Sequence, residues 1–299
     1  MTIGHIAEQD DALRAGCFAA LDVLRARHGE ELPLKDGLDQ GFHFDGGRVP
    51  FLNHQKGIFR ANRQHGPAAL SVMTSSKSPY DADEETAEGF WYAYRSGENG
   101  ERDNETMRAA MRLQTPIVYY RSFSPGRYTA LYPVYIVEDD PHARRVLLSS
   151  GMIRLGEAVP LVGVERSYAV RESRVRLHQS RFRSLVLPAY SEQCAICRLK
   201  ERRLLDAAHI RPDASVDASA HVTNGLSLCT IHHRAYDQDI VGIDPDYKVR
   251  VAKKLLEDTD GPMLELLKTF HGASLNLPKR VELQPDRELL AERYERFTS

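Results

Sequence analysis

The stretch that decides the fold of the C-terminal half reads Cys194-Ala-Ile-Cys197, then Leu205-Asp-Ala-Ala-His209-Ile-Arg-Pro212, then Asn224-Gly-Leu-Ser-Leu-Cys229-Thr-Ile-His232-His233-Arg-Ala-Tyr-Asp237. It holds a C-x-x-C turn and, about thirty residues further on, a C-x-x-H turn. Two such turns can place four soft ligands tetrahedrally around one zinc ion. We therefore expect Cys194, Cys197, Cys229 and His232 to bind a structural Zn²⁺. If the cysteines were ordinary core residues, the two matched turns would have no explanation.

The residues between and after these turns add a second pattern. The order AAHI, NGL and then LC-x-x-HH-x-x-YD resembles the HNH nuclease family, whose domain is also called ββα-metal, over roughly residues 175–250. The resemblance implies a β-hairpin that carries His209, a loop that carries Asn224 and a helix that carries His233. It also implies a metal-dependent DNA endonuclease.

Phosphodiester hydrolysis gives these residues their expected roles. By its match to the first motif position, His209 is the candidate general base that deprotonates the attacking water. His233, at the last motif position, is expected to bind one divalent ion, Mg²⁺, Mn²⁺ or another, which stabilises the charge on the leaving oxygen. Asn224, the middle letter, holds the loop and the base in orientation in the family.

The chain departs from the family pattern at one position. Many relatives carry an acidic or histidine metal ligand directly before the general base, where this chain has Ala208. Asp206 is the nearest carboxylate, although it could equally be a turn residue. Asp237 follows His233 by four residues, so on a helix the two could share a face. It could also contact a metal ligand without binding the metal itself. If Ala208 replaces an essential ligand, the domain is an inactive nuclease, which the otherwise intact pattern disfavours.

Length and hydrophobic patterning predict an α+β protein of two domains. The chain has 299 residues, of which 42% are hydrophobic, enough for two cores. We place the boundary near residue 165, which gives domains 1–165 and 166–299. Apolar periodicity predicts helices over 10–27, 104–113, 170–189, 262–270 and 286–297, the second capped by Asp103 or Asn104. Residues rich in β-branched and aromatic side chains predict strands over 69–73, 90–94, 117–120 and 132–137. A strongly curved or barrel-like sheet follows for the first domain.

The first half also resembles, more weakly, the reader half of certain two-domain restriction nucleases. The resemblance rests on residues 41–59, the aromatic strand after them and Asp103-Asn104; Tyr80-Asp81 is similar to a fragment of the SRA signature, which is otherwise not matched. In those enzymes a PUA-like or SRA-like domain recognises a modified base, and an HNH domain cuts nearby. A reader of modified cytosine extrudes the base into a pocket of aromatic faces and hydrogen-bonding groups. The candidate pocket residues are Trp91, Tyr94, Asp81, Asp103 and Asn104, although an ordinary sheet core would explain the aromatic residues as well.

Charge and composition bear on the partners. The net charge of -2 gives no overall sign of nucleic-acid binding, but arginines crowd one predicted helix, where they are expected to contact DNA phosphates. These are Arg171, Arg174, Arg176, Arg181 and Arg183. No signal peptide or membrane-spanning run is recognisable, so a cytoplasmic protein with no membrane partner is expected. Cys17 is expected to be a buried small hydrophobe.

These features lead to one main interpretation and two alternatives. The main one is a restriction endonuclease that reads modified cytosine in double-stranded DNA, acting as a homodimer because each chain has one site and duplex cleavage needs two nicks. The first alternative is an HNH endonuclease that reads unmodified sequence. The second is a non-catalytic, zinc-stapled DNA-binding protein, which would need no added divalent ion.

Overall fold

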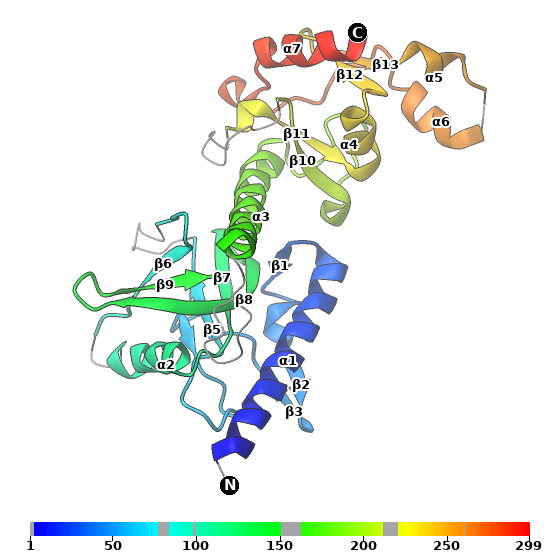
Figure 1. Cartoon of the computed structure of the whole chain (residues 1–299). Helices are drawn as coiled ribbons and strands as arrows, with labels where there is room; N and C mark the ends of the chain where they lie inside the picture. The colour runs from blue at the N-terminus through cyan, green and yellow to red at the C-terminus, as the bar shows by residue number, and fades with distance from the viewer. Residues whose placement is uncertain (1–2, 77–83, 98–99, 151–162, 212–220, 260) are drawn as a thin grey trace. The chain divides into compact units, whose positions relative to one another are not determined.

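The computed structural model describes residues 3–76, 84–97, 100–150, 163–211, 221–259 and 261–299 (Figure 1). The expected pocket residue Asp81 lies outside them. The chain is α+β and divides into two compact units, Met1–Leu177 and His178–Ser299. The division falls within helix α3 (Gly163–Ala189), in whose first turns the sequence places the boundary. Among the described residues, no helix is both long and apolar enough to cross a bilayer.

The first unit is built on one curved sheet whose strands run in the order β4-β5-β7-β8-β9-β6, with β1 paired to β8. Strands β5 and β7 are parallel, and the other pairs are antiparallel. The sheet strands are β1 (Glu31–Pro33), β4 (Ile58–Phe59), β5 (Ser71–Thr74), β6 (Phe90–Ala93), β7 (Ile117–Ser124), β8 (Arg127–Asp140) and β9 (Arg145–Ser149). Register shifts interrupt the pairing of β8 with both β7 and β9, and such bulges increase the local twist. The curved sheet expected from the sequence is therefore confirmed.

Both faces of this sheet are covered, which explains the apolar character of β7. Tyr119 belongs to a core with Met107 of helix α2 (Gly100–Arg112), whereas Tyr120 belongs to a core with Leu13 and Cys17 of helix α1 (Ile3–His28). Successive strand residues point to opposite faces, so β7 supplies one tyrosine to each core. A small hairpin of β2 (Phe42–Phe44) and β3 (Gly47–Val49) completes this unit.

The expected cap of α2 is wrong. The helix begins at Gly100, so Asp103 and Asn104 lie within its first turns. Asn104 is fully buried, and its amide group bonds to both the backbone N–H and the carbonyl of Arg95. That amide ties α2 to the end of β6 instead of capping the helix.

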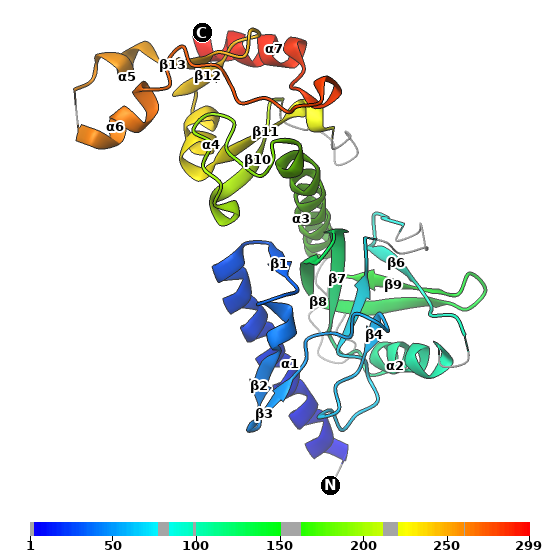
Figure 2. The ribbon, with the colours of Figure 1, turned by 180° about the vertical axis from the view of Figure 1, so that it is seen from behind.

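The second unit places a ββα arrangement against the C-terminal part of α3. Strands β10 (Leu205–His209) and β11 (Gly225–Cys229) form an antiparallel hairpin, followed directly by helix α4 (Thr230–Asp237). The remaining elements are β12 (Val241–Ile243), β13 (Val249–Val251), α5 (Lys253–Glu257), α6 (Gly261–Lys268) and α7 (Arg287–Thr298), seen from behind in Figure 2. One core unites α3, the hairpin, α4 and α7, through residues such as Val186, Leu226, Tyr236 and Leu290.

Candidate functional site

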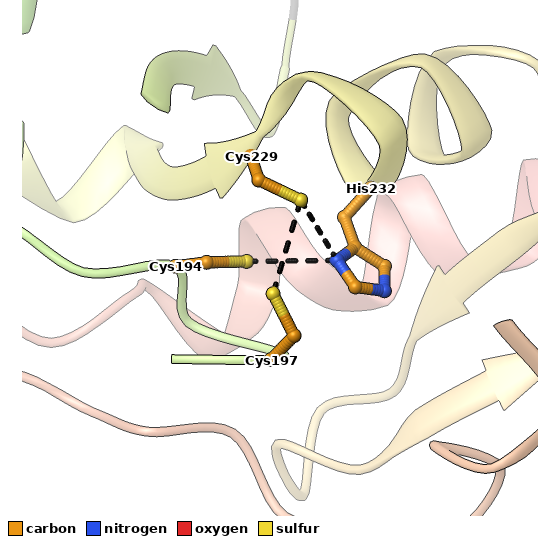
Figure 3. Close-up of side chains that lie close together, drawn as sticks. All are labelled: Cys194, Cys197, Cys229 and His232. Carbon is orange, nitrogen blue, oxygen red and sulfur yellow. Dashed lines mark hydrogen bonds between the residues drawn. The ribbon is translucent and has the colours of Figure 1, made fainter. Parts of the chain in front are cut away.

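Four side chains form a compact cluster of metal-binding groups (Figure 3). The ligand atoms of Cys194, Cys197, Cys229 and His232 all lie within 4.8 Å of one another. His232 turns its Nδ1 toward the sulfurs, at 3.1 Å from Cys229 Sγ and 3.6 Å from Cys194 Sγ. Three thiols and one imidazole at these separations suit a tetrahedral ion such as zinc. The cluster could therefore hold a metal.

The backbone brings these four residues together from two directions. Cys194 and Cys197 lie in a turn after α3, closed by the Arg198 N–H donating to the Cys194 carbonyl. The Ala195 N–H donates to Ser227 of β11 at 2.7 Å, which joins that turn to the strand ending in Cys229. His232 follows in the first turn of α4.

The three thiols of the cluster share protons unevenly. A hydrogen bond from the Cys229 thiol lowers the pKa of Cys194, the same hydrogen bond raises the pKa of Cys229, and burial raises that of Cys197. The other ring nitrogen of His232, Nε2, is buried without a partner among the described residues, and its ring meets Phe270 edge-on at 5.3 Å. The sulfurs and Nδ1 are thus the polar atoms that face the cluster.

A second cluster lies on α4 and β10, around His233. Its Nδ1 is 3.4 Å from Asp206 Oδ2, and its Nε2 is 3.5 Å from Asp237 Oδ2. The hydrogen bond with Asp206 raises the pKa of His233, with help from the charge of Asp237. The same hydrogen bond lowers the pKa of Asp206. Carboxylates and an imidazole can each bind a divalent ion, but Asp206 and Asp237 face different nitrogens of the His233 ring, so only one of them lies on the side of any single ion that His233 would bind.

Asp206 is held from its other side by Arg183 of α3. The guanidinium Nη1 lies 3.3 Å from Asp206 Oδ1 and also donates to the Leu205 carbonyl, while Nη2 donates to the Arg202 carbonyl at 2.8 Å. Arg183 therefore fixes the start of β10, and the other oxygen of Asp206, Oδ2, faces His233.

His209 and Asn224 lie at the end of the hairpin where the loop joins its two strands. His209 ends β10 and pairs with Gly225. The Asn224 side chain accepts from the Arg211 N–H at 2.9 Å and donates to the Arg211 carbonyl at 3.1 Å, while its own carbonyl accepts from the Ile210 N–H. Asn224 thus fixes the backbone directly after His209.

The five arginines of α3 differ in what they contact. Arg174 faces Glu85 at 3.9 Å, Arg176 pairs with Glu30 and Glu172, and Arg183 clamps β10. Arg171 and Arg181 are exposed. Neither has an ion pair with any residue that the structure describes.

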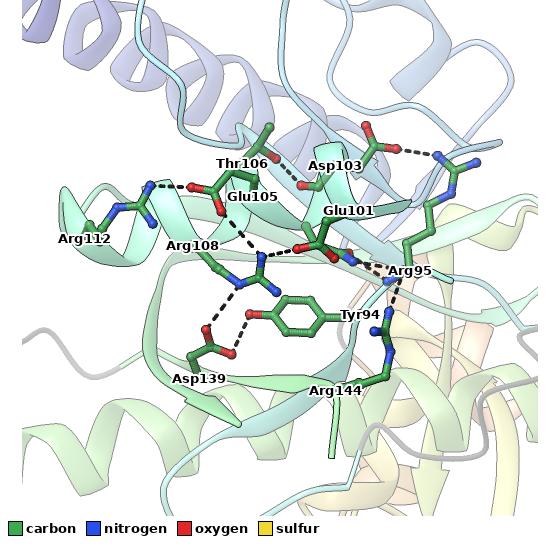
Figure 4. Close-up of polar contacts among 11 residues, drawn as sticks. Tyr94, Arg95, Glu101, Asp103, Glu105, Thr106, Arg108, Arg112, Asp139 and Arg144 are labelled. Atoms are coloured by element: carbon green, nitrogen blue, oxygen red, sulfur yellow. Dashed lines mark hydrogen bonds and ion pairs between the residues drawn. The ribbon is translucent and has the colours of Figure 1, made fainter. Parts of the chain in front are cut away.

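The candidate pocket residues that the structure describes contact other side chains and backbone groups of the first unit, as Figure 4 shows for Tyr94 and Asp103. The Tyr94 hydroxyl donates to Asp139 at 2.6 Å and its ring lies under Arg108; burial raises its pKa. Asp103 pairs with Arg95, and the Asn104 amide is occupied as described above. Trp91 is half-buried on β6, with the Arg145 guanidinium 4.2 Å from its ring centre.

Two contacts to the HNH-like residues were not predicted from the sequence. Arg183 was expected to contact DNA phosphates, yet it bonds to Asp206 and to the backbone beside it, and the ring of Phe182 stacks on His209. The only sequence signal for these contacts is that Phe182 and Arg183 are neighbours in the predicted helix before the C-x-x-C turn.

A hairpin and a following helix, with a histidine at the end of the first strand and a histidine and aspartate on the helix, define the ββα-metal class of nuclease domain. Residues 194–244 match the family described as HNH endonuclease. The match covers this segment alone, which is the HNH endonuclease domain of the chain.

Solved structures and curated sequences complete the comparison. The structure described as a modification-dependent TagI restriction endonuclease shares 15% identity, covers 82% of this chain and 86% of its own, and has a TM-score of 0.32. The type IV phosphorothioation-dependent restriction endonuclease ScoMcrA shares 14% identity, covers 79% of this chain and 59% of its own, and has a TM-score of 0.26. No curated protein sequence matches the chain.

Proposed function

We propose that this protein is a metal-dependent DNA endonuclease that hydrolyses phosphodiester bonds with His209 and His233 in its active site. The observation that carries the proposal is the Asp206–His233–Asp237 cluster, which lies on the same hairpin and helix as His209 and Asn224. Binding alone would need neither this second cluster nor the histidine that is held at the end of the same strand. A non-catalytic zinc-stapled protein is therefore the less favoured reading.

Each side chain has a role in the proposed reaction. His209 accepts the proton of the attacking water, since histidine takes up protons near neutral pH. Asn224 holds the loop after His209 through its two bonds to Arg211, and so limits the movement of the base. His233 and the carboxylate at one of its ring nitrogens, Asp206 at Nδ1 or Asp237 at Nε2, would hold one Mg²⁺ or Mn²⁺, which would supply charge stabilisation at the leaving oxygen. The Cys194 cluster would hold Zn²⁺ as a structural ion.

Asp206 can take the place of the metal ligand that many relatives have at the position of Ala208. Alternate residues of a strand point to the same face, so Asp206 and Ala208 share a face of β10. Ala208 is fully buried in the core, whereas Asp206 reaches His233. We take Asp206 as the carboxylate that replaces a ligand at position 208.

The nuclease proposal is tested by cleavage of plasmid DNA with purified protein, with and without added Mg²⁺ or Mn²⁺. We expect cutting that depends on the added ion and is abolished in His209→Ala, a loss of at least about a hundredfold for removal of a general base. The His209→Ala protein also controls for contaminating nuclease. Cutting that survives in His209→Ala, or no cutting by the natural chain with any divalent ion, would reject the proposal.

The finer proposal is that the first unit reads modified cytosine in duplex DNA as a PUA-like or SRA-like domain. The resemblance of residues 41–59 and the curved sheet support it, and Trp91 is the nominated stacking residue, with Tyr94, Asp103, Asn104 and Asp81 the other candidates. The exposed Arg171 and Arg181 would contact phosphates, and two protomers would meet on the duplex.

Matched duplexes with plain cytosine, 5-methylcytosine or 5-hydroxymethylcytosine test the reader proposal. We expect faster cleavage of a modified duplex, with the preference reduced in Trp91→Ala because base stacking is worth about 1–3 kcal/mol. Equal cutting of all three would leave an endonuclease that reads unmodified sequence.

A further inference from the structure

The ring of Phe182 on α3 lies flat against the imidazole of His209. The ring centres are 3.8 Å apart and the ring planes differ by only 9°. Most aromatic pairs have centres 4.5–7 Å apart, so this is an unusually close face-to-face contact. It joins a helix residue to a strand residue 27 positions later, at the end of β10.

Phe182 cannot move away from this position easily. Its side chain is 1% exposed and lies in the core of the second unit. On the partner strand, a Cβ added to Gly225 would lie 2.5 Å from Val186 Cγ2 and 2.8 Å from Phe182 Cζ. Gly225 has an ordinary φ of -130°, so the glycine is needed for the close approach of the helix and not for its backbone conformation.

Gly225 is also the residue that pairs with His209 across the hairpin. Helix α3 therefore packs against the residue pair of the hairpin that includes His209. On the other side, Asn224 fixes the backbone of Ile210 and Arg211. The main chain of His209 is held by the hairpin and the loop, and its ring is held by Phe182.

The terminal torsion of a histidine side chain is broad and has no sharp preferred value. A flat wall at van der Waals distance restricts the imidazole to planes parallel to that wall. A general base must aim its free nitrogen at the attacking water, and small errors of placement are costly. From this geometry we infer that Phe182 is a positioning residue that sets the ring plane of His209 for proton abstraction. The inference rests on the proposed role of His209 as the base.

The alternative role of Phe182 is packing alone, and it makes a different prediction. A packing residue affects stability, whereas a positioning residue also changes the turnover of folded enzyme. Val186 provides the matched control, because it is fully buried on the same helix and touches the same Gly225 position without stacking on His209. Tyrosine is unsuitable at position 182, since its hydroxyl would extend from Cζ into the Gly225 backbone.

The experiment compares the full-length natural chain, Phe182→Leu and Val186→Ala. Folding is checked by thermal unfolding, and kcat and KM are measured for DNA cleavage with Mg²⁺. In parallel, proton–carbon NMR of ring-labelled histidine follows the His209 signal, assigned by its disappearance in His209→Ala. A proton held over an aromatic face is shifted upfield, so this signal reports the stack without reference to activity.

We expect Phe182→Leu to move the His209 signal toward that of an unstacked histidine and to lower kcat by about tenfold or more with KM nearly unchanged. Val186→Ala should keep both the signal and kcat. An unchanged His209 signal in Phe182→Leu, or a lost stack with normal kcat, would overturn the inference and leave the nuclease proposal intact. A natural chain that cleaves no DNA would overturn the proposed function, and with it the positioning role, even if the stack is seen.

Discussion

Asp206 lies between a guanidinium and an imidazole, and each of its oxygens faces one of them. Oδ1 lies 3.3 Å from Arg183 and Oδ2 lies 3.4 Å from His233. Because Arg183 also bonds two backbone carbonyls at the entry to β10, it fixes the direction of the carboxylate as well as its position. The residue expected to contact DNA thus serves the geometry of the site.

Replacing Arg183 with methionine should therefore weaken both the fold and the reaction. The Leu205 and Arg202 carbonyls would lose their donors in a partly buried setting, at a cost of about 1–3 kcal/mol of unfolding free energy. Urea unfolding of the two proteins measures this difference. DNA cleavage by the folded variant should also fall, since Asp206 loses its clamp.

The control for this change is Arg181→Met, two residues away on the same helix. Arg181 is exposed, so its replacement should alter stability by less than about 0.5 kcal/mol. Equal destabilisation by the two substitutions would show that Arg183 acts as a general surface charge and not as a clamp.

At the scale of elements, the Cys194 cluster joins the turn after α3 to the junction of β11 and α4. Helix α4 carries His233, and β11 pairs with the strand that carries His209. A metal in the cluster would therefore stabilise the hairpin and helix on which the second site depends.

Thiol labelling of native protein tests this arrangement of cysteines. Cys17 is fully buried on α1, and burial raises its pKa to about 12, so at pH 8 it should stay unreactive with or without a chelator. Cys194, Cys197 and Cys229 should be protected while the metal is bound and become reactive after chelation. Mass spectrometry of the labelled protein counts the three modified residues. Rapid labelling of the three before chelation would argue against a bound metal.

The sequence predicted the elements that have a long apolar pattern and those that a local motif marks. Helices α1 and α3 and strand β8 are longer than predicted, because strand pairing and packing extend them over residues whose own propensity for helix or strand is weaker. The hairpin of β2 and β3 was not predicted. Asp45 and Gly46, with φ of 46° and 68°, form the kind of tight connection that an Asp-Gly pair favours, so this signal was available.

The sequence predicted the hairpin and the helix that carry His209, Asn224 and His233, but not the contacts that support these residues. The roles of the three residues stay predictions. The stack of Phe182 on His209 and the clamp of Arg183 on Asp206 depend on how α3 packs against the hairpin. That packing rests on the absence of a side chain at Gly225, which no periodic pattern reveals.

At the scale of the whole molecule, we propose two different metals for two different clusters of one chain. The cysteine cluster would hold Zn²⁺ for the fold, and the His233 cluster would hold Mg²⁺ or Mn²⁺ for the reaction. His232 and His233 are adjacent in sequence, yet His232 faces the sulfurs and His233 faces the two carboxylates. Removing His233 should therefore separate the two functions.

The most direct test measures zinc content and DNA cleavage on the same preparations of the natural chain and His233→Ala. We expect one zinc per chain in both proteins, with Mg²⁺- or Mn²⁺-dependent cleavage by the natural chain and none by His233→Ala. Loss of zinc from His233→Ala, or cleavage by that variant at the natural rate, would contradict the assignment of separate structural and catalytic ions.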